Sequence, residues 1–243
     1  MKFAILAAGN IANSMAEAVS GIDAVEKYAV ACREIERAKK FADKWDFEKA
    51  YGSYEEMLED PEVELVYVAS PHSHHYQHTK MCLEHGKHVL VEKAFTVNAK
   101  QAEELIRMAK DKGLLLAEAI WTRYMPSRKM IDEIVDSGVI GKVTSLTANL
   151  GYVLPHVERM QKPELAGGAL LDLGVYPINF ALMAFHEDVQ NITSTAVLSP
   201  AGIDWMNSIT LTFAEGKMAV LHSDMLAQTD RQGVINGDKG YNE

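Results

Sequence analysis

Short apolar segments alternate with helix-forming segments over the first 118 residues, and this alternation restricts the fold more than any other feature of the sequence. Strands are expected at residues 2–8, 28–32, 49–51, 65–69, 88–91 and 114–118. Helical segments are expected between them, at about residues 11–20, 34–45, 55–58 and 98–112, with another after residue 71. Strands that alternate with helices are typical of a doubly wound parallel sheet with right-handed crossovers. The sequence therefore predicts an α/β fold that begins with a Rossmann domain.

The pattern changes near residue 119, where longer strands of alternating hydrophobicity follow a helix that starts at Pro126 and ends near Ser137. These strands are expected at residues 143–153, 192–198, 208–213 and 218–224. In the third strand, apolar and hydroxyl side chains alternate, which is typical of a sheet covered on one face only. We predict a first domain at 1–119 and, at 120–243, a second domain of α+β type with an open, mainly antiparallel sheet.

Charge and cysteine content restrict the partners and the compartment. The formal net charge of −10 argues against nucleic acid or an anionic membrane as the main partner. Two cysteines, Cys32 and Cys82, form no disulfide framework and are typical of a reducing compartment. An apolar strand begins at Lys2, which leaves no room for a signal peptide, and we expect no apolar run of membrane-spanning length. The sequence thus predicts a cytoplasmic protein with no nucleic-acid or membrane partner.

Two turns of the first domain predict a dinucleotide site. Gly9, Asn10 and Ile11 connect the first strand to a helix, whose N-terminal amides can bind a pyrophosphate. Alanines at two of the three usual glycine positions make this fingerprint weak. At the end of the second strand, where an acid normally binds the ribose 2′-hydroxyl, the chain has Cys32 and Arg33. An arginine can pair with a 2′-phosphate, so NADP is favoured, with NAD possible; the alternative is a surface arginine paired with a nearby glutamate.

A histidine-rich segment follows the fourth strand. Four potential metal ligands lie near one face of the expected helix: His75, His78, Cys82 and His85. Metal sites usually draw ligands from more than one element, whereas polar groups beyond the end of a parallel strand more often line an organic ligand. We therefore predict that Ser70, Pro71, His72 and His75 bind the cofactor and that the chain holds no metal.

The segment Gly86–Phe95, GKHVLVEKAF, places an ionisable pair at the end of the fifth strand. A buried strand at 88–91 is followed directly by Glu92 and Lys93. Ligands of parallel sheets bind beyond the carboxyl ends of the strands, so both residues are candidate site residues. The alternative is that both are solvated residues where a strand reaches the surface.

A second ionisable pair lies in Gly167–Pro177 of the second domain. Asp172 and Tyr176 are four residues apart and share one face of an expected helix. An acid and a phenol are costly to bury among Leu and Ala without partners. A catalytic role is favoured if Lys93 lies within reach; otherwise Asp172 would bond the backbone and Tyr176 would pack in the core.

These motifs together resemble the glucose–fructose oxidoreductase/inositol dehydrogenase/MocA family. Residues 86–95 are similar to its Glu-Lys-Pro signature, and the companion signatures occur in the correct order at 8–12, at 70–75 and at 167–176. Many members have histidine at the position of Tyr176; tyrosine resembles the branch of dimeric dihydrodiol dehydrogenase and NADP-dependent xylose dehydrogenase. The departures from the family pattern are Ala7 for glycine, Ala94 for proline and His72 for asparagine.

The resemblance implies hydride transfer between a nicotinamide and a carbinol or carbonyl carbon of a sugar or cyclic diol. In that hypothesis Tyr176 exchanges the hydroxyl proton, Lys93 lowers the pKa of Tyr176, and Asp172 orients the substrate. Trp121 is expected to contact the cofactor, and the segments 121–125 and 152–160 to form pocket walls.

The resemblance also implies that residues 1–119 form a dinucleotide-binding domain, that residues 120–243 form a substrate and oligomerisation domain, and that two copies form a homodimer through the open sheet. The polar end at 236–243 suggests a C-terminally shortened chain. Two alternatives stay open: a non-catalytic NADP-binding regulator or sensor of the same fold, and a metal-dependent hydrolase built on the histidines. No serine-nucleophile elbow or phosphate-loop lysine motif favours another hydrolase or a kinase.

Overall fold

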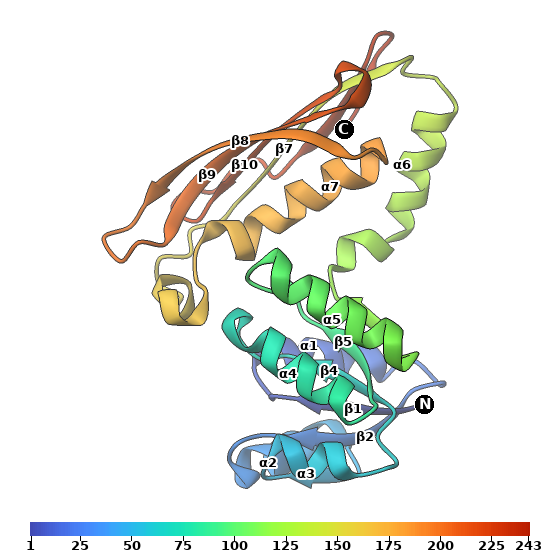
Figure 1. Cartoon of the computed structure of the whole chain (residues 1–243), viewed down its shortest axis with the longest axis vertical. Coiled ribbons are helices and arrows are strands. Elements are labelled where there is room, and N and C mark those ends of the chain that lie inside the picture. The colour runs from blue at the N-terminus through green and yellow to red at the C-terminus, as the bar shows by residue number, and fades with distance from the viewer. The chain divides into compact units, whose positions relative to one another are not determined.

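The computed structural model describes residues 1–243, which divide into two compact units, residues 1–119 and 120–243. The first unit contains a six-stranded sheet in the order β3-β2-β1-β4-β5-β6, and every pair of neighbours is parallel. The strands are β1 Lys2–Leu6, β2 Glu26–Ala31, β3 Lys49–Tyr51, β4 Leu65–Val68, β5 His88–Val91 and β6 Leu116–Glu118. The predicted parallel Rossmann-type sheet is confirmed (Figure 1).

Helices cover both faces of this sheet. They are α1 Asn10–Val19, α2 Ile35–Trp45, α3 Tyr54–Glu59, α4 His72–Glu84 and α5 Ala99–Lys112. Side chains of α1 and α2 join one buried apolar cluster, and side chains of α3, α4 and α5 join a second cluster on the other face. Because both faces are buried, the central strands β1 and β4 are almost uniformly apolar.

The ends of α5 follow from its sequence. The Asn98 side chain accepts a hydrogen bond from the Gln101 amide at 3.1 Å, and Gly113 ends the helix in a left-handed conformation. Its apolar side chains are not all buried, because Ile106 is 56% exposed while Leu105 and Ala109 are buried. The helix packs mainly beside α4, so its buried stripe is narrower than the sequence pattern suggests.

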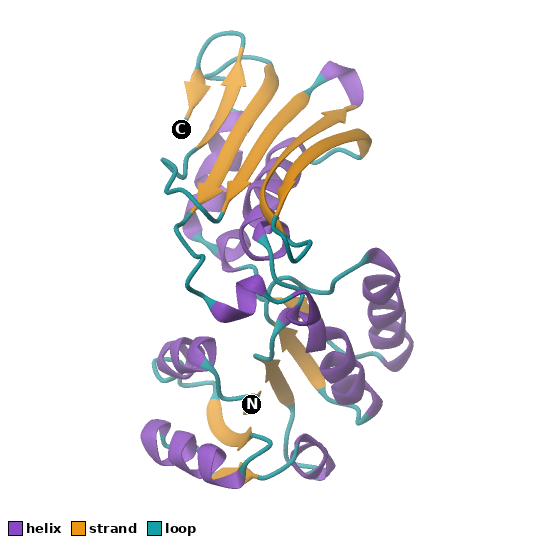
Figure 2. Ribbon diagram, turned by 90° about the vertical axis from the view of Figure 1, so that its left-hand side faces the viewer, coloured by secondary structure: helices purple, strands orange, loops and turns teal.

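The second unit contains a mixed, mainly antiparallel sheet in the order β12-β11-β7-β10-β9-β8, in which only β7 and β10 are parallel neighbours. The strands are β7 Val143–Gly151, β8 Val189–Leu198, β9 Asp204–Phe213, β10 Met218–Asp224, β11 Gly233–Gly237 and β12 Tyr241–Asn242. The helices are α6 Pro126–Asp136 and α7 Val175–Phe185. The predicted open sheet is confirmed (Figure 2).

Both helices lie on one face of the second sheet, and their apolar side chains form its core with the strands (Figures 1 and 2). In β9 the predicted alternation is correct, because Ile209, Leu211 and Phe213 are buried in this core while the hydroxyl side chains between them are more exposed. The opposite face is open, and Met218 and Val220 of β10 are each 43% exposed. The sheet is therefore covered on one side only.

One stretch, Pro163–Phe185, is long and apolar enough to cross a membrane by length and composition, so the expectation of no such run is wrong. It combines a short 3-10 turn, a π-helical turn at Leu170–Gly174 and α7, and 56% of its most apolar window is buried. Core helices share this composition, and the apolar side chains of α7 pack against the sheet.

Candidate active site

The carboxyl ends of four parallel strands form one continuous edge in the first unit. Backbone hydrogen bonds of 3.0 Å join the strand ends, from Ala69 to Leu6 and from Glu92 to Val68. A predicted site residue follows each of these strands: Gly9 after β1, Arg33 after β2, Ser70 after β4 and Glu92 after β5. The structure thus brings these residues to the edge at which parallel sheets bind ligands.

The turn after β1 leads directly into α1. Ala7 has φ of 75°, a left-handed conformation that favours glycine, at the position where the usual fingerprint has its first glycine. Gly9 precedes the helix in an extended conformation, and no side chain caps the helix N-terminus. Asn10 and Ile11 are exposed there. Their amides therefore suit the pyrophosphate that the sequence predicts.

The turn after β2 presents arginines rather than the cysteine. Cys32 is 4% exposed and packs in an apolar cluster, so its thiol supports the fold, while Arg33 is exposed. Burial raises the pKa of Tyr54, and the positive charges of Arg33 and Arg37 oppose this rise. Arg37, which sequence reasoning missed, is an exposed residue near the start of α2, and its charge acts on Tyr54 as that of Arg33 does. Its only sequence signal was the four-residue spacing from Arg33.

The α4 histidines are mostly engaged within the fold. His75 is fully buried; its Nδ1 lies 2.6 Å from the Ala94 carbonyl oxygen and its Nε2 lies 2.7 Å from the Ser70 carbonyl oxygen. Both ring nitrogens face carbonyl oxygens inside the fold, and a neutral ring donates a hydrogen bond to one of the two. The His75 ring thus lies between the ends of β4 and β5 and is not open to a ligand. Burial lowers its pKa, and also lowers the pKa of His78 to about 4.

Other polar groups of this segment are shielded too. Ser70 and His72 are each 7% exposed, and the Ser70 hydroxyl lies 2.9 Å from Nδ1 of His78. Pro71 is exposed beside them. Cofactor contacts of these residues stay predictions. No group of three or more His, Cys, Asp or Glu side chains in residues 1–243 could hold a metal ion.

The Glu92 carboxyl group forms hydrogen bonds at the end of β5. The Tyr67 hydroxyl donates to Oε1 of Glu92, and the Lys93 amide lies 3.2 Å from Oε2 of Glu92. Burial raises the pKa of Glu92, and the hydrogen bond from Tyr67 opposes this rise. The peptide bond between Lys93 and Ala94 is cis. Lys93 itself is half-buried.

In the second unit, two glycines allow the chain to pack closely before Asp172. A Cβ atom on Gly168, whose φ is 114°, would lie 2.2 Å from Oδ1 of Asp204. A Cβ atom on Gly167 would lie 2.5 Å from the carbonyl oxygen of Met160. Oδ2 of Asp204 accepts the Leu170 amide at 2.7 Å. Only glycines allow this close approach.

Asp172 lies in the π-helical turn and not in a regular α-helix as expected. It is 6% exposed, and its Oδ1 lies 3.0 Å from Nη2 of Arg159. The Tyr176 hydroxyl accepts the indole N–H of Trp121 at 3.2 Å, and the two rings are in edge contact. The structure thus pairs Asp172 with Arg159 and Tyr176 with Trp121. Arg159 fell within a predicted pocket wall, but its partner was not predictable from spacing.

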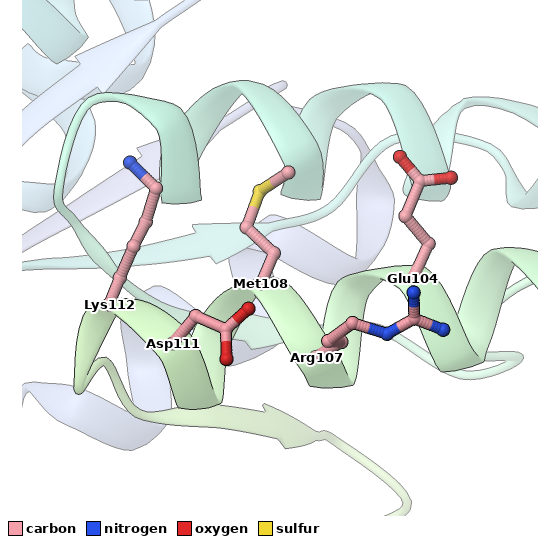
Figure 3. Close-up of a pocket in the computed structure, with 5 residues that line it drawn as sticks. All are labelled: Glu104, Arg107, Met108, Asp111 and Lys112. Atoms are coloured by element: carbon pink, nitrogen blue, oxygen red, sulfur yellow. The ribbon is translucent and has the colours of Figure 1, made fainter.

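A pocket of about 290 Å³ lies on α5 in the first unit (Figure 3). Its lining side chains all come from that helix: Glu104, Arg107, Met108, Asp111 and Lys112. None of them was predicted as a site residue, and the pocket is largely open to solvent. Four of the five lining side chains are charged, whereas ligand sites are lined mainly by apolar side chains with a few polar groups.

In comparisons with known proteins, each of the two units matches a protein-family model. Residues 1–119 match the oxidoreductase family with an NAD-binding Rossmann fold, and residues 129–243 match the GFO/IDH/MocA C-terminal domain. The trans-1,2-dihydrobenzene-1,2-diol dehydrogenase of Xenopus tropicalis is 38% identical over 242 residues, which cover 98% of this chain and 73% of that protein. The D-xylose 1-dehydrogenase (NADP(+)) of Hypocrea jecorina is 38% identical over 276 residues, covering 99% and 71%.

A solved structure agrees with this assignment. A 3-ketoreductase from Actinomadura kijaniata, in complex with NADP, is 28% identical and matches with a TM-score of 0.92. The match covers 98% of this chain and 74% of that one. The predicted resemblance is confirmed, and the chain belongs to the GFO/IDH/MocA family of oxidoreductases.

Proposed function

We propose that this protein is an NAD(P)-dependent dehydrogenase or reductase that acts on a sugar or a cyclic diol. One observation carries the proposal. Two ionisable side chains of one helical stretch each have a hydrogen-bond partner: Asp172 contacts Arg159, and Tyr176 contacts Trp121. Relatives at 38% identity are named as dehydrogenases of a diol and of xylose. NADP is the proposed cofactor, supported by Arg33 and Arg37 beyond β2 and by the name of the xylose relative.

The side chains suit alcohol oxidation and its reverse. The nicotinamide, when bound, supplies the hydride acceptor or donor. Tyr176 takes the hydroxyl proton as the alcohol becomes a carbonyl, and returns it in the reverse direction. The indole N–H of Trp121 stabilises the phenolate form of Tyr176, because a donor to the charged oxygen favours that form. Lys93 is the proposed cationic residue of the reaction, since a positive charge near a phenol favours its phenolate form.

Asp172 serves as the acceptor for substrate hydroxyls. Its partner Arg159 places a positive charge 3.0 Å from the nearly buried carboxyl group, and a carboxylate accepts hydrogen bonds only. Vicinal hydroxyl groups of a sugar or diol are suitable donors to such a group.

The test is kinetic. Wild-type protein is assayed for NADP reduction with a panel of aldoses and cyclic diols, beside Tyr176→Phe and Lys93→Met. Each substitution should lower kcat by about 10²–10⁴-fold, the range for positioned acid–base groups. Tyr241→Phe removes an exposed phenol from β12 and serves as the control. Wild-type turnover in both variants would show that these residues are not the acid–base groups; binding of NADPH without turnover of any substrate would favour a non-catalytic sensor.

We also propose a homodimer that forms through the open face of the second sheet, supported by the exposed Met218 and Val220. A cytoplasmic location stays a prediction, supported by two free cysteines that are both buried.

A further inference from the structure

Three elements of the first unit hold the segment around Lys93. The Tyr67 hydroxyl, from β4, donates to Glu92. The His75 ring, from α4, contacts the carbonyl oxygen of the residue after Lys93 at 2.6 Å. Oε1 of Glu118, at the end of β6, accepts the Phe95 amide at 2.9 Å. The backbone is therefore fixed on both sides of the lysine.

Of these three elements, β4 contacts a titratable side chain of the segment, because Tyr67 donates to the Glu92 carboxyl group. Its side chain is 1% exposed, and its ring stacks with Phe3 at 6.4 Å between centroids. Packing on all sides restricts the rotation of the ring, so the hydroxyl has a fixed direction. A buried hydroxyl needs a partner, and here that partner is the Glu92 carboxyl group.

The charge state of Glu92 depends on few neighbours. Burial raises its pKa most, and the hydrogen bond from Tyr67 is the largest opposing effect. The positive charge of Lys93 lowers this pKa, and the negative charge of Glu118 raises it. On α4, burial lowers the pKa of His75, so that ring carries little positive charge near neutral pH. Without the Tyr67 hydroxyl, Glu92 would bind a proton at higher pH.

We propose that Tyr67 is a positioning residue that acts through Glu92: its hydroxyl keeps the carboxylate ionised and aligned beside Lys93 for binding a ribose hydroxyl of the nicotinamide cofactor. This inference rests on the proposed function, because it takes Glu92 as a cofactor ligand. An ionised carboxylate accepts hydrogen bonds from sugar hydroxyls, whereas a proton removes one acceptor position. Tyr67 thus sets the lower pH limit of cofactor binding without touching the cofactor.

The experiment measures the dissociation constant of NADPH by fluorescence between pH 5.5 and 8.5. In the wild type, binding should weaken as pH falls through the pKa of Glu92. In Tyr67→Phe the same loss should begin about one pH unit higher, with affinity at pH 8.5 close to wild type. Glu92→Gln keeps an acceptor for Tyr67 but does not titrate, so its profile should be flatter than that of the wild type. The phosphate of NADPH titrates near pH 6 in every variant, so profiles are compared between variants.

Tyr28→Phe is the matched control. Tyr28 is also 1% exposed in a strand of the same sheet, and its hydroxyl donates to a carboxylate, Asp60, at 3.0 Å. It belongs to the apolar cluster on the opposite face from Tyr67. Losing this hydroxyl should lower stability but leave the pH profile of NADPH binding unchanged.

Several outcomes would overturn the proposal: a wild-type profile in Tyr67→Phe, an equal shift in Tyr28→Phe, or a wild-type acid limb in Glu92→Gln. The Glu92→Gln profile tests the role of Glu92 even if Tyr67→Phe does not fold. The readout is binding, so a wild-type protein that binds NADPH with the expected profile but has no turnover contradicts the proposed function alone. A wild-type protein that binds no NADPH overturns both.

Discussion

Single side chains show how strongly this fold depends on satisfied buried polar groups. Oδ2 of Asp60 accepts hydrogen bonds from Lys49 at 2.8 Å, from Tyr51 at 2.6 Å and from Tyr28 at 3.0 Å. Burial alone would raise the pKa of Asp60, but the hydrogen bonds, led by that from Lys49, hold it well below its usual range. The network lies between β2, β3 and the end of α3, so it ties one edge of the sheet together.

Asp60→Asn should destabilise the protein by about 1–3 kcal/mol at pH 7, because the donors around Asp60 lose a charged acceptor. A carboxyl group with a lowered folded-state pKa stabilises the fold above its unfolded-state pKa, about 4. The difference between wild type and variant should therefore be constant near neutrality and shrink as pH falls below about 4. Urea unfolding followed by circular dichroism at pH 7 and pH 3.5 measures it. A difference that grows in acid would contradict the assignment; Glu62→Gln, on the exposed side of the same loop, is the control.

Gly168→Ala should be one of the most damaging small substitutions in the second unit. The added Cβ meets Asp204, and the φ of 114° is strained for any side chain, so a loss of about 3 kcal/mol is expected. Gly202→Ala is the matched control: its φ is 83°, but nothing lies within 4 Å of the added atom. Thermal unfolding of both variants separates the stability loss caused by the steric clash with Asp204 from the loss caused by backbone strain. Equal losses would show that the contact with Asp204 is not tight.

Residue identity was easier to predict than residue partnership. Asp172 and Tyr176 were identifiable because polar groups on an apolar helical face need partners. Their partners, Arg159 and Trp121, are 13 and 55 residues away in sequence, and only the folded chain selects them. The direction of the Cys32 side chain was not predictable for a related reason: a residue at the end of a strand can face the ligand or the core, and this one packs in the core.

At the scale of elements, strand type and order were largely readable from the sequence. The strands Lys49–Tyr51, His88–Val91 and Met218–Asp224 have the predicted bounds, because short β-branched or apolar runs between turn residues leave little freedom. The π-helical turn at Leu170–Gly174 was not predictable. Gly167 packs closely against Met160 just before this turn, and Asp204 contacts Gly168 and accepts the Leu170 amide. Local periodicity does not encode these long-range contacts.

The turn between β2 and α2 should determine the choice of cofactor. Arg33→Ala should weaken NADPH binding by roughly 10–100-fold, the loss expected for one charge-assisted hydrogen-bond pair, and should leave NADH binding within about threefold. Parallel fluorescence titrations with the two cofactors measure this. Arg107→Ala, in the pocket on α5, should change neither affinity. Equal weakening of both cofactors would mean that Arg33 does not contact the 2′-phosphate.

For the whole molecule, the uncovered face of the second sheet is the surface that bears on assembly. Val220 lies on this face in β10, between β7 and β9 in the sheet. If two copies join there, Val220→Lys should convert a dimer to a monomer, because a buried unpaired charge is costly. Sedimentation velocity at micromolar concentration measures the change. Val139→Lys, on an exposed residue after α6, is the control. A monomeric wild type would contradict the proposed homodimer.

Both thiol groups of the molecule, those of Cys32 and Cys82, are buried and form no disulfide. Cys82 lies in one apolar cluster of the first unit and Cys32 in the other, and burial raises the pKa of Cys82 further above the range in which thiols react. The native protein should therefore resist alkylation and mild oxidants. A cysteine introduced at an exposed position would become the single attachment point for a fluorescent or spin label, without removal of either natural one.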